Sequence, residues 1–186
     1  MQKFAHIEEA VQNAKSIELT HSGTEVYKFK VLPFGERGTY LKHALIAEIS
    51  EGLCSAIKKI FPDFDYIVSP EPGGHVWGVL VALQLQKSLN ILRSSPTYEA
   101  KERAVNRKTG YYQHNLYFNH FKRGDRVLIV DDVVSTGGTL DTILATLIDL
   151  GVTPVGVQVV YAKSEEYKKI EAKYAISING LLCSLL

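Results

Sequence analysis

The chain has 186 residues, 46% of them hydrophobic and 22% charged, which favours one globular domain with a substantial core. Its 21 basic and 20 acidic residues leave a net charge of +1, so we expect no nucleic-acid or membrane-surface partner. No apolar run approaches the roughly 20 residues of a spanning helix, and Glu8 and Glu9 argue against a signal peptide; a cytoplasmic protein is predicted.

Residues 1–40 are expected to form a small N-terminal unit. A short helix is predicted from Ile7 to Ala14, and the alternation of polar and apolar residues from Glu25 to Val31 predicts a strand. The loop at 33–38 is either a simple connection or, through an exposed Phe34 and Arg37, a contact for a planar base; the connection is the favoured reading.

A long helix is predicted from Leu41 to Ile60, because aliphatic residues recur there at every fourth position. Cys54 lies in this helix and is expected in or near the core. Cys54 and Cys183 belong to no C-x-x-C pair and have no histidine at metal-ligand spacing, so both are expected to be plain thiols.

A strand at Asp65 to Ser69 is followed by the glycine loop 70–75 and a helix predicted over 76–88. This order places a helix N-terminus, with its unpaired N–H groups, beside a strand end, which is typical of an anion site. A cis peptide bond is expected at Ser69-Pro70 or Glu71-Pro72, and His75 is read as either a ligand or a packing residue.

Leu89 to Arg93 predicts the next strand, and the segment from Ser94 to Gly110 lacks apolar periodicity. We therefore expect 94–110 to be a long loop, either a solvated segment without a role or a mobile lid over a site. Tyr111 to Phe118 is rich in strand formers and predicts a hairpin that anchors this lid.

The chain then reaches Val127 to Leu140, where four aliphatic residues run into Asp131 and Asp132 and a small hydroxylated glycine loop. The aliphatic run predicts a strand buried on both faces that stops at the acids, and helical spacing resumes at Leu140. The loop between them offers backbone N–H groups and hydroxyls to a phosphate. Neither G-x-x-x-x-G-K-[ST] nor G-x-G-x-x-G occurs in the chain, which leaves a monophosphate site beside two acids.

Further strands are predicted at Val155 to Tyr161 and, at the sheet edge, Tyr174 to Ile178. The alternation of strands and helices predicts an α/β fold with a doubly wound parallel sheet and ligands at its carboxyl edge.

Val-Asp-Asp-Val-Val-Ser-Thr-Gly-Gly-Thr at 130–139 resembles the diphosphate-binding motif of the type I phosphoribosyltransferases, and the resemblance extends from about residue 43 to 161. It implies a single domain over 1–186, with a hood at 1–40 and a flexible lid at 94–110. It also implies a homodimer and Mg²⁺ as cofactor. The amino-acid sequence most resembles that of the purine enzymes, of adenine type or of archaeal hypoxanthine/guanine type.

The resemblance also assigns roles to individual residues. Asp131 and Asp132 would be catalytic, would bind the ribose hydroxyls and would meet the metal only indirectly. The substrate-binding residues would be Val134, Ser135, Thr136, Gly137, Gly138 and Thr139 for the 5'-phosphate, and Pro72, Gly73, Gly74, Arg93 and Lys101 for pyrophosphate. Glu71, an acid in the same loop, is expected either to point away or to touch a substrate hydroxyl or a hydrated metal.

The substrates implied are 5-phosphoribosyl 1-diphosphate and a purine. Ser135 stands where mammalian-type 6-oxopurine enzymes have an aspartate, so adenine is favoured by a small margin over hypoxanthine or guanine. An alternative of another class is a non-catalytic regulator that senses the diphosphate.

Overall fold

Five parallel strands form the central sheet of the computed structural model, which describes residues 4–21, 25–108 and 113–183. Their order across the sheet is β4-β3-β7-β8-β9. The strands are β3 (Tyr66–Pro70), β4 (Ser88–Leu92), β7 (Arg126–Val134), β8 (Thr153–Ala162) and β9 (Ile178–Cys183). The central strand β7 is fully buried over 127–130, as its aliphatic run predicts.

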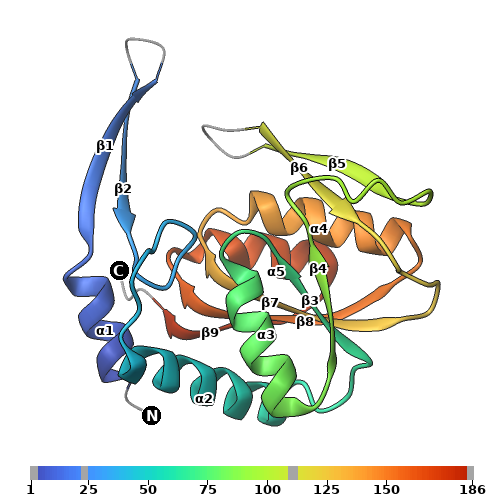
Figure 1. Ribbon diagram of the computed structural model, residues 1–186, viewed down its shortest axis with the longest axis horizontal. Helices are drawn as coiled ribbons and strands as arrows, with labels where there is room; N and C mark the ends of the chain where they lie inside the picture. The colour runs from blue at the N-terminus through green and yellow to red at the C-terminus, as the bar shows by residue number, and fades with distance from the viewer. Residues whose placement is uncertain (1–3, 22–24, 109–112, 184–186) are drawn as a thin grey trace.

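Helices cover both faces of this sheet (Figure 1). On one face lie α2 (His43–Ile60) and α3 (Gly74–Leu85), with α1 (Ala5–Gln12) packed on α2. On the other lie α4 (Gly138–Asp149) and α5 (Lys168–Tyr174). Leu128 and Val130 of β7 join the first core with Trp77, whereas Val127 and Ile129 join the second with Ile143. The doubly wound α/β class is confirmed.

Two antiparallel hairpins stand outside the sheet and project beyond it in Figure 1. One pairs β1 (Lys15–His21) with β2 (Glu25–Val31), and the other pairs β5 (Arg103–Lys108) with β6 (Gln113–Phe118). The prediction for Glu25 to Val31 is confirmed, whereas β1 was not predicted.

The expectation of a loop throughout 94–110 is wrong in its second half, because β5 occupies 103–108. Its backbone is paired with β6 in a register that joins Arg103 to Phe118, a partner 15 residues further along the chain. Hydrophobic periodicity within 94–110 does not reveal such a pairing, since strand formation here depends on the partner. Thr109 and Gly110, with Tyr111 and Tyr112 of the predicted hairpin, lie outside the described residues.

Two further boundaries differ from expectation. The strand β7 continues through both acids to Val134, where its register joins Val134 to Ala162 of β8. The predicted edge strand at Tyr174 to Ile178 is wrong: α5 ends at Tyr174 and the edge strand begins at Ile178. A short 3-10 helix, η1 (Glu165–Tyr167), precedes α5.

The segment 167–174 is helical because Tyr167, Ile170 and Tyr174 recur at three- and four-residue spacing, which turns their rings and aliphatic atoms toward the second core. Within the described residues, no helix is both long and apolar enough to cross a membrane.

Candidate active site

Two helices begin side by side at the carboxyl edge of the sheet. The chain leaves β3 through the cis bond Glu71-Pro72 and enters α3, and it leaves β7 and enters α4. The two strands are parallel neighbours, with Val68 level with Ile129, so both helix N-termini lie at one edge. The N-cap residues are Gly73 and Gly137, and glycine has no side chain that could satisfy the first N–H groups. Both termini therefore suit an anion.

The loop that enters α4 has a shape that only glycine permits at its centre. Gly137 has φ +85°, and a Cβ at this position would lie 2.6 Å from Cγ1 of Ile170 in α5. Its carbonyl accepts the first helical hydrogen bond, from the Asp141 N–H at 2.7 Å. Thr136 and Gly138 are exposed, and Ser135 and Thr139 are half-buried. The loop thus presents backbone and hydroxyl groups to an incoming phosphate.

The two acids lie directly against the other glycine loop. A Cβ on Gly74 would lie 2.5 Å from Oδ1 of Asp131, and a Cβ on Gly73 would lie 2.0 Å from Oδ2 of Asp132. A side chain at Gly73 or Gly74 would therefore displace a carboxylate. These contacts bring together the predicted residues Asp131, Asp132, Gly73 and Gly74.

Asp132 is the more buried acid, with 8% of its surface exposed. Burial raises its pKa, which the hydrogen bonds it receives, including the 2.7 Å bond from the Val133 N–H, only partly oppose. The charge of Glu36 raises the pKa further, although the backbone of Glu36 also hydrogen-bonds to this carboxylate. A buried acid with a raised pKa at a ligand-binding edge is typical of a functional group.

The loop at 33–38 closes one side of Asp132. A Cβ on Gly35 would lie 3.5 Å from the Asp132 carboxylate. Phe34 is only 2% exposed, and its carbonyl accepts a 2.9 Å hydrogen bond from the Trp77 indole. The guanidinium of Arg37 lies over the Phe29 ring at 5.0 Å. The idea of an exposed Phe34 that contacts a base is wrong, because this side chain belongs to the core under the loop.

Arg93, which is predicted to meet pyrophosphate, binds Glu71, the acid of the same predicted site. The Arg93 guanidinium lies 3.0 Å from a Glu71 oxygen, and Ser94 donates its N–H at 2.8 Å and its hydroxyl at 3.0 Å to the other oxygen. Burial alone would raise the pKa of Glu71, but the Ser94 hydrogen bonds and the Arg93 charge lower it. The acid is therefore ionised and neutralises Arg93 in this structure.

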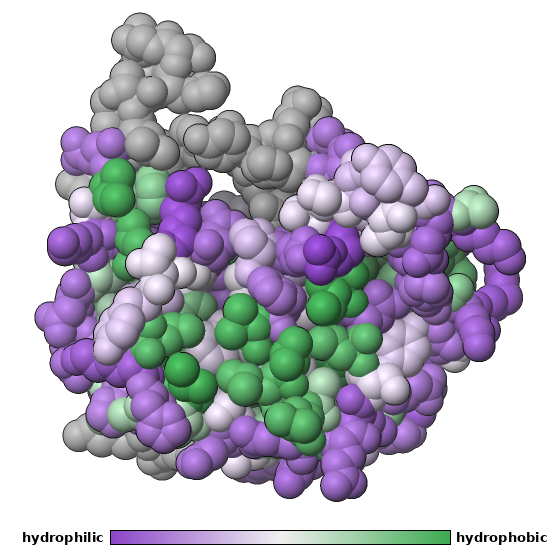
Figure 2. Space-filling model, viewed as in Figure 1, coloured by the Kyte–Doolittle hydropathy of each residue, from purple (hydrophilic) through white to green (hydrophobic). Residues whose placement is uncertain are grey.

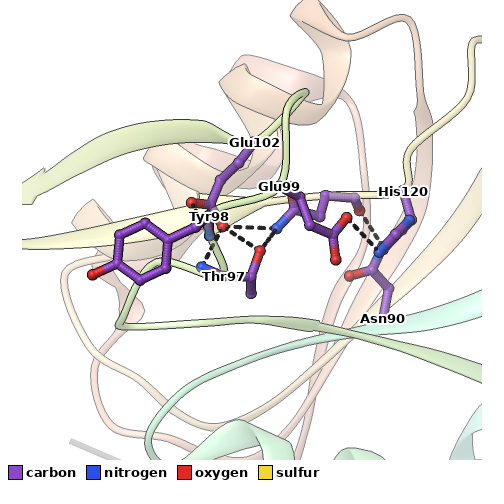
Figure 3. A network of polar contacts seen from close by, with 7 residues as sticks. Asn90, Thr97, Tyr98, Glu99, Glu102 and His120 are labelled. Atoms are coloured by element: carbon purple, nitrogen blue, oxygen red, sulfur yellow. Dashed lines mark hydrogen bonds and ion pairs between the residues drawn. The ribbon is translucent and has the colours of Figure 1, made fainter.

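The segment 94–102 is held by a polar network shown in Figure 3. The Glu102 carboxylate accepts hydrogen bonds from the backbone and hydroxyl of Thr97, the Tyr98 N–H and the Asn119 amide, at 2.7–3.3 Å. Asn90 of β4 donates to the Asn119 carbonyl at 2.8 Å, which ties the network to the sheet. Lys101 is exposed on this turn, and its predicted contact with pyrophosphate stays a prediction.

Four residues near the loop at 135–139, which is predicted to bind phosphate, make contacts that the sequence did not suggest: Ser164, Ile170, Lys173 and Tyr174. They follow β8 and lie in or before α5, the helix whose last residue was expected to begin a strand. The helical spacing of Tyr167, Ile170 and Tyr174 is the signal that could have found them.

The phosphoribosyl transferase domain family matches residues 37–179 of this chain. A hypoxanthine/guanine phosphoribosyltransferase from Methanohalobium evestigatum is 34% identical over 158 residues, which cover 82% of each chain. A protein named HGPRTase-like protein 2 from Haloterrigena turkmenica is 34% identical over 137 residues, 74% of each chain.

Solved structures agree on the fold. Adenine phosphoribosyltransferase from Thermoanaerobacter pseudethanolicus superposes with a TM-score of 0.71 and 22% identity, and the match covers 96% of this chain and 99% of that one. The Trypanosoma brucei adenine enzyme, solved with AMP, pyrophosphate and ribose-5-phosphate, gives 0.75 with 16% identity over 95% and 78% of the two chains. The chain belongs to the type I phosphoribosyltransferases, and its place is in the purine branch of that family.

Proposed function

We propose that this protein transfers the phosphoribosyl group of 5-phosphoribosyl 1-diphosphate to a ring nitrogen of hypoxanthine or guanine, as a step of purine salvage. The observation that carries the proposal is the pair of glycine-capped helix N-termini at one edge of the sheet, the first of which lies directly against Asp131 and Asp132. One terminus suits the 5'-phosphate and the other suits pyrophosphate. The carboxylates between them suit the ribose.

The reaction breaks the bond between the anomeric carbon and the pyrophosphate oxygen and forms a bond from that carbon to nitrogen. Positive charge grows on the sugar as negative charge grows on the leaving group. Asp131 and Asp132 accept hydrogen bonds from the ribose hydroxyls and stabilise the positive charge, while residues 134–139 hold the 5'-phosphate. The base loses its ring proton to solvent, and the products are a nucleoside 5'-monophosphate, pyrophosphate and the released proton.

The Mg²⁺ expected from the family fits this arrangement as an ion carried by the substrate. Within the described residues, no group of three or more His, Cys, Asp or Glu side chains is arranged to hold a metal ion. Mg²⁺ commonly keeps its waters and takes substrate phosphates with one or two carboxylates as ligands. It would supply charge neutralisation of the leaving pyrophosphate, with Asp131 and Asp132 acting through ribose hydroxyls or water.

The choice of base differs from the expectation from Ser135, which slightly favoured adenine. Relatives at about 34% identity carry hypoxanthine/guanine names, whereas the adenine enzymes match at 22% identity or less and support the fold alone. Hypoxanthine or guanine is therefore the better supported acceptor, and adenine is the second candidate.

Turnover tests both the reaction and the base. The purified protein is incubated with Mg²⁺, 5-phosphoribosyl 1-diphosphate and each purine separately, and nucleotide formation is followed by absorbance and chromatography. We expect IMP or GMP to form with a kcat/KM at least about tenfold above that for AMP, a difference worth about 1.4 kcal/mol. Product only with adenine would select the second candidate. Diphosphate binding without product for any base would support a sensor instead.

We also propose a cytoplasmic homodimer that uses the outer face of α3. Val76, Val79 and Leu83 are 39%, 47% and 75% exposed and recur at helical spacing. Figure 2 shows an apolar area on the face of the molecule where α3 lies. An apolar stripe of this kind on a helix without charged residues suits a two-fold interface, in which the same surface meets itself.

A further inference from the structure

We propose that α5 positions the phosphate loop, and that Lys173 neutralises Asp141 with the help of a hydrogen bond from Tyr174, so that the N-terminus of α4 keeps its attraction for the substrate 5'-phosphate. The proposal rests on the proposed function, since it takes the loop at 135–139 to be the phosphate site. It adds Lys173 and Tyr174 as positioning residues that act through Asp141 and do not touch the substrate.

The chain at the end of β8 is hydrogen-bonded to the start of the phosphate loop through two consecutive residues. The Lys163 N–H donates to the Val134 carbonyl at 2.8 Å, and the Ser164 hydroxyl donates to the Ser135 carbonyl at 3.1 Å. These two bonds hold the carbonyls of Val134 and Ser135 at the start of the loop. Because backbone position decides anion binding here, residues 163–164 set part of the site's geometry.

Ile170 makes the next contact, against the centre of the loop. Its Cγ1 lies 2.6 Å from the place where a Cβ on Gly137 would stand. Ile170 is partly buried and packs on the second core with Tyr174. The helix thus fills the space behind Gly137, so the loop has a fixed support on the side away from the exposed Thr136 and Gly138.

The last contact involves charge. Asp141 lies in the first turn of α4, where a carboxylate is within reach of an anion bound at the helix N-terminus and would repel it. Lys173 Nζ and the Tyr174 hydroxyl each donate to Asp141 Oδ1 at 2.7 Å. Hydrogen bonds from Lys173 and Tyr174 lower the pKa of Asp141, so the acid is ionised at neutral pH. Its negative charge is therefore balanced by Lys173 and is not abolished by protonation.

The test measures the dissociation constant of ribose 5-phosphate, together with KM for the diphosphate and kcat. Lys173→Met leaves Asp141 without its cation, and we expect ribose 5-phosphate to bind about three- to tenfold more weakly, the scale of one charge near a helix terminus. KM should rise similarly, with kcat little changed. Lys168→Met is the matched control, because Lys168 lies on the same helix but pairs with Glu165.

The double variant separates neutralisation from simple bracing. If Lys173 acts by neutralising Asp141, adding Asp141→Asn to Lys173→Met restores binding to the wild-type value or better, and Asp141→Asn alone does not weaken it. If the contact only holds α5 in place, the double variant binds as weakly as Lys173→Met, and the neutralising role of Lys173 is overturned. Tyr174→Phe should weaken binding by a smaller factor, since it removes a neutral donor.

The two proposals fail differently. Absence of turnover with every purine, combined with the predicted pattern in ribose 5-phosphate binding, would refute the reaction and support the role of α5. Normal turnover with unchanged binding and KM in Lys173→Met would refute the role of α5 alone. A wild-type protein that does not bind ribose 5-phosphate would overturn this inference directly.

Discussion

Asp132 is buried among backbone groups, an environment that costs an ionised carboxylate much of its hydration. Its neighbours at Gly35 and Gly73 come from two other loops, so the acid also fixes where those loops lie. A residue of this kind serves function at the expense of stability.

Asp132→Asn is expected to lower kcat on the order of 10²-fold, because it removes a preorganised negative charge from beside the developing cation. Asp63→Asn is the control, since Asp63 is exposed and pairs with Arg126 at the other end of β7. Steady-state kinetics with both substrates saturating makes the comparison. An unchanged kcat would remove Asp132 from the mechanism.

The same variant has a predicted pH signature in stability. Because the pKa of Asp132 is raised in the folded state, the folded protein binds more protons than the unfolded chain from about pH 4 upward, and this acid then destabilises the fold increasingly as pH rises to its folded pKa. In urea unfolding, the free energy of unfolding of Asp132→Asn relative to that of wild type should therefore increase across this pH range. A constant difference between the two proteins would contradict the assignment.

Glu71 pairs with Arg93 in this structure, so under the predicted role of Arg93 it would compete with pyrophosphate for that cation. Glu71→Gln should therefore tighten pyrophosphate binding by about three- to tenfold, a modest factor because the Arg93 side chain is 48% exposed. Calorimetric titration measures it, with ribose 5-phosphate as the control ligand. Weaker pyrophosphate binding would instead mean that Glu71 holds Arg93 in its binding position.

Among the elements, the β5–β6 hairpin is joined to the body by Leu116 and Phe118, which are buried in the second core, and also by polar contacts. Arg103 pairs with Asp149 of α4 at 2.5 Å, and Arg93 bridges to Tyr117 of β6. The Arg103–Asp149 pair is exposed and adds little stability. The buried side chains of β6 suit the hairpin to an anchoring role, and the lid expected at 94–110 stays a prediction.

Glu102→Ala should loosen the turn at 94–102 without unfolding the sheet, because one carboxylate there receives four hydrogen bonds. Amide hydrogen exchange should become faster over this turn while β3 and β7 stay protected. Glu99→Ala is the control, since Glu99 lies on the same turn and pairs with exposed His120. Equal exchange in the two variants would show that Glu102 does not hold the turn.

At the scale of the whole molecule, α3 carries one face of the first core and leaves its other face apolar and exposed. Leu83→Glu should convert a dimer to a monomer, because a charge at the centre of an apolar two-fold contact meets its own copy. Light scattering after gel filtration measures the mass. The control is Ile148→Glu, which alters an exposed aliphatic residue on α4, and a dimer in both variants would place the interface elsewhere.

Much of the fold could be read along the chain because it depends on local patterns. The aliphatic run of β7, the four-residue spacing of α2 and the two glycine loops are each continuous in sequence. These patterns, with Asp131 and Asp132, were enough to predict the sheet, the carboxyl edge and the phosphate loop. The family match supports the fold, and the phosphate loop stays a prediction.

The tertiary structure decided the features that depend on partners distant in sequence. The strand β5 exists through β6, Glu71 is neutralised by Arg93, and α5 supports a loop about 30 residues before it through Ile170 and Gly137. No local pattern encodes these contacts, because their energy is realised only when the chain has brought both partners together. The sequence by itself thus determined the class of site, and folding determined which side chains support it.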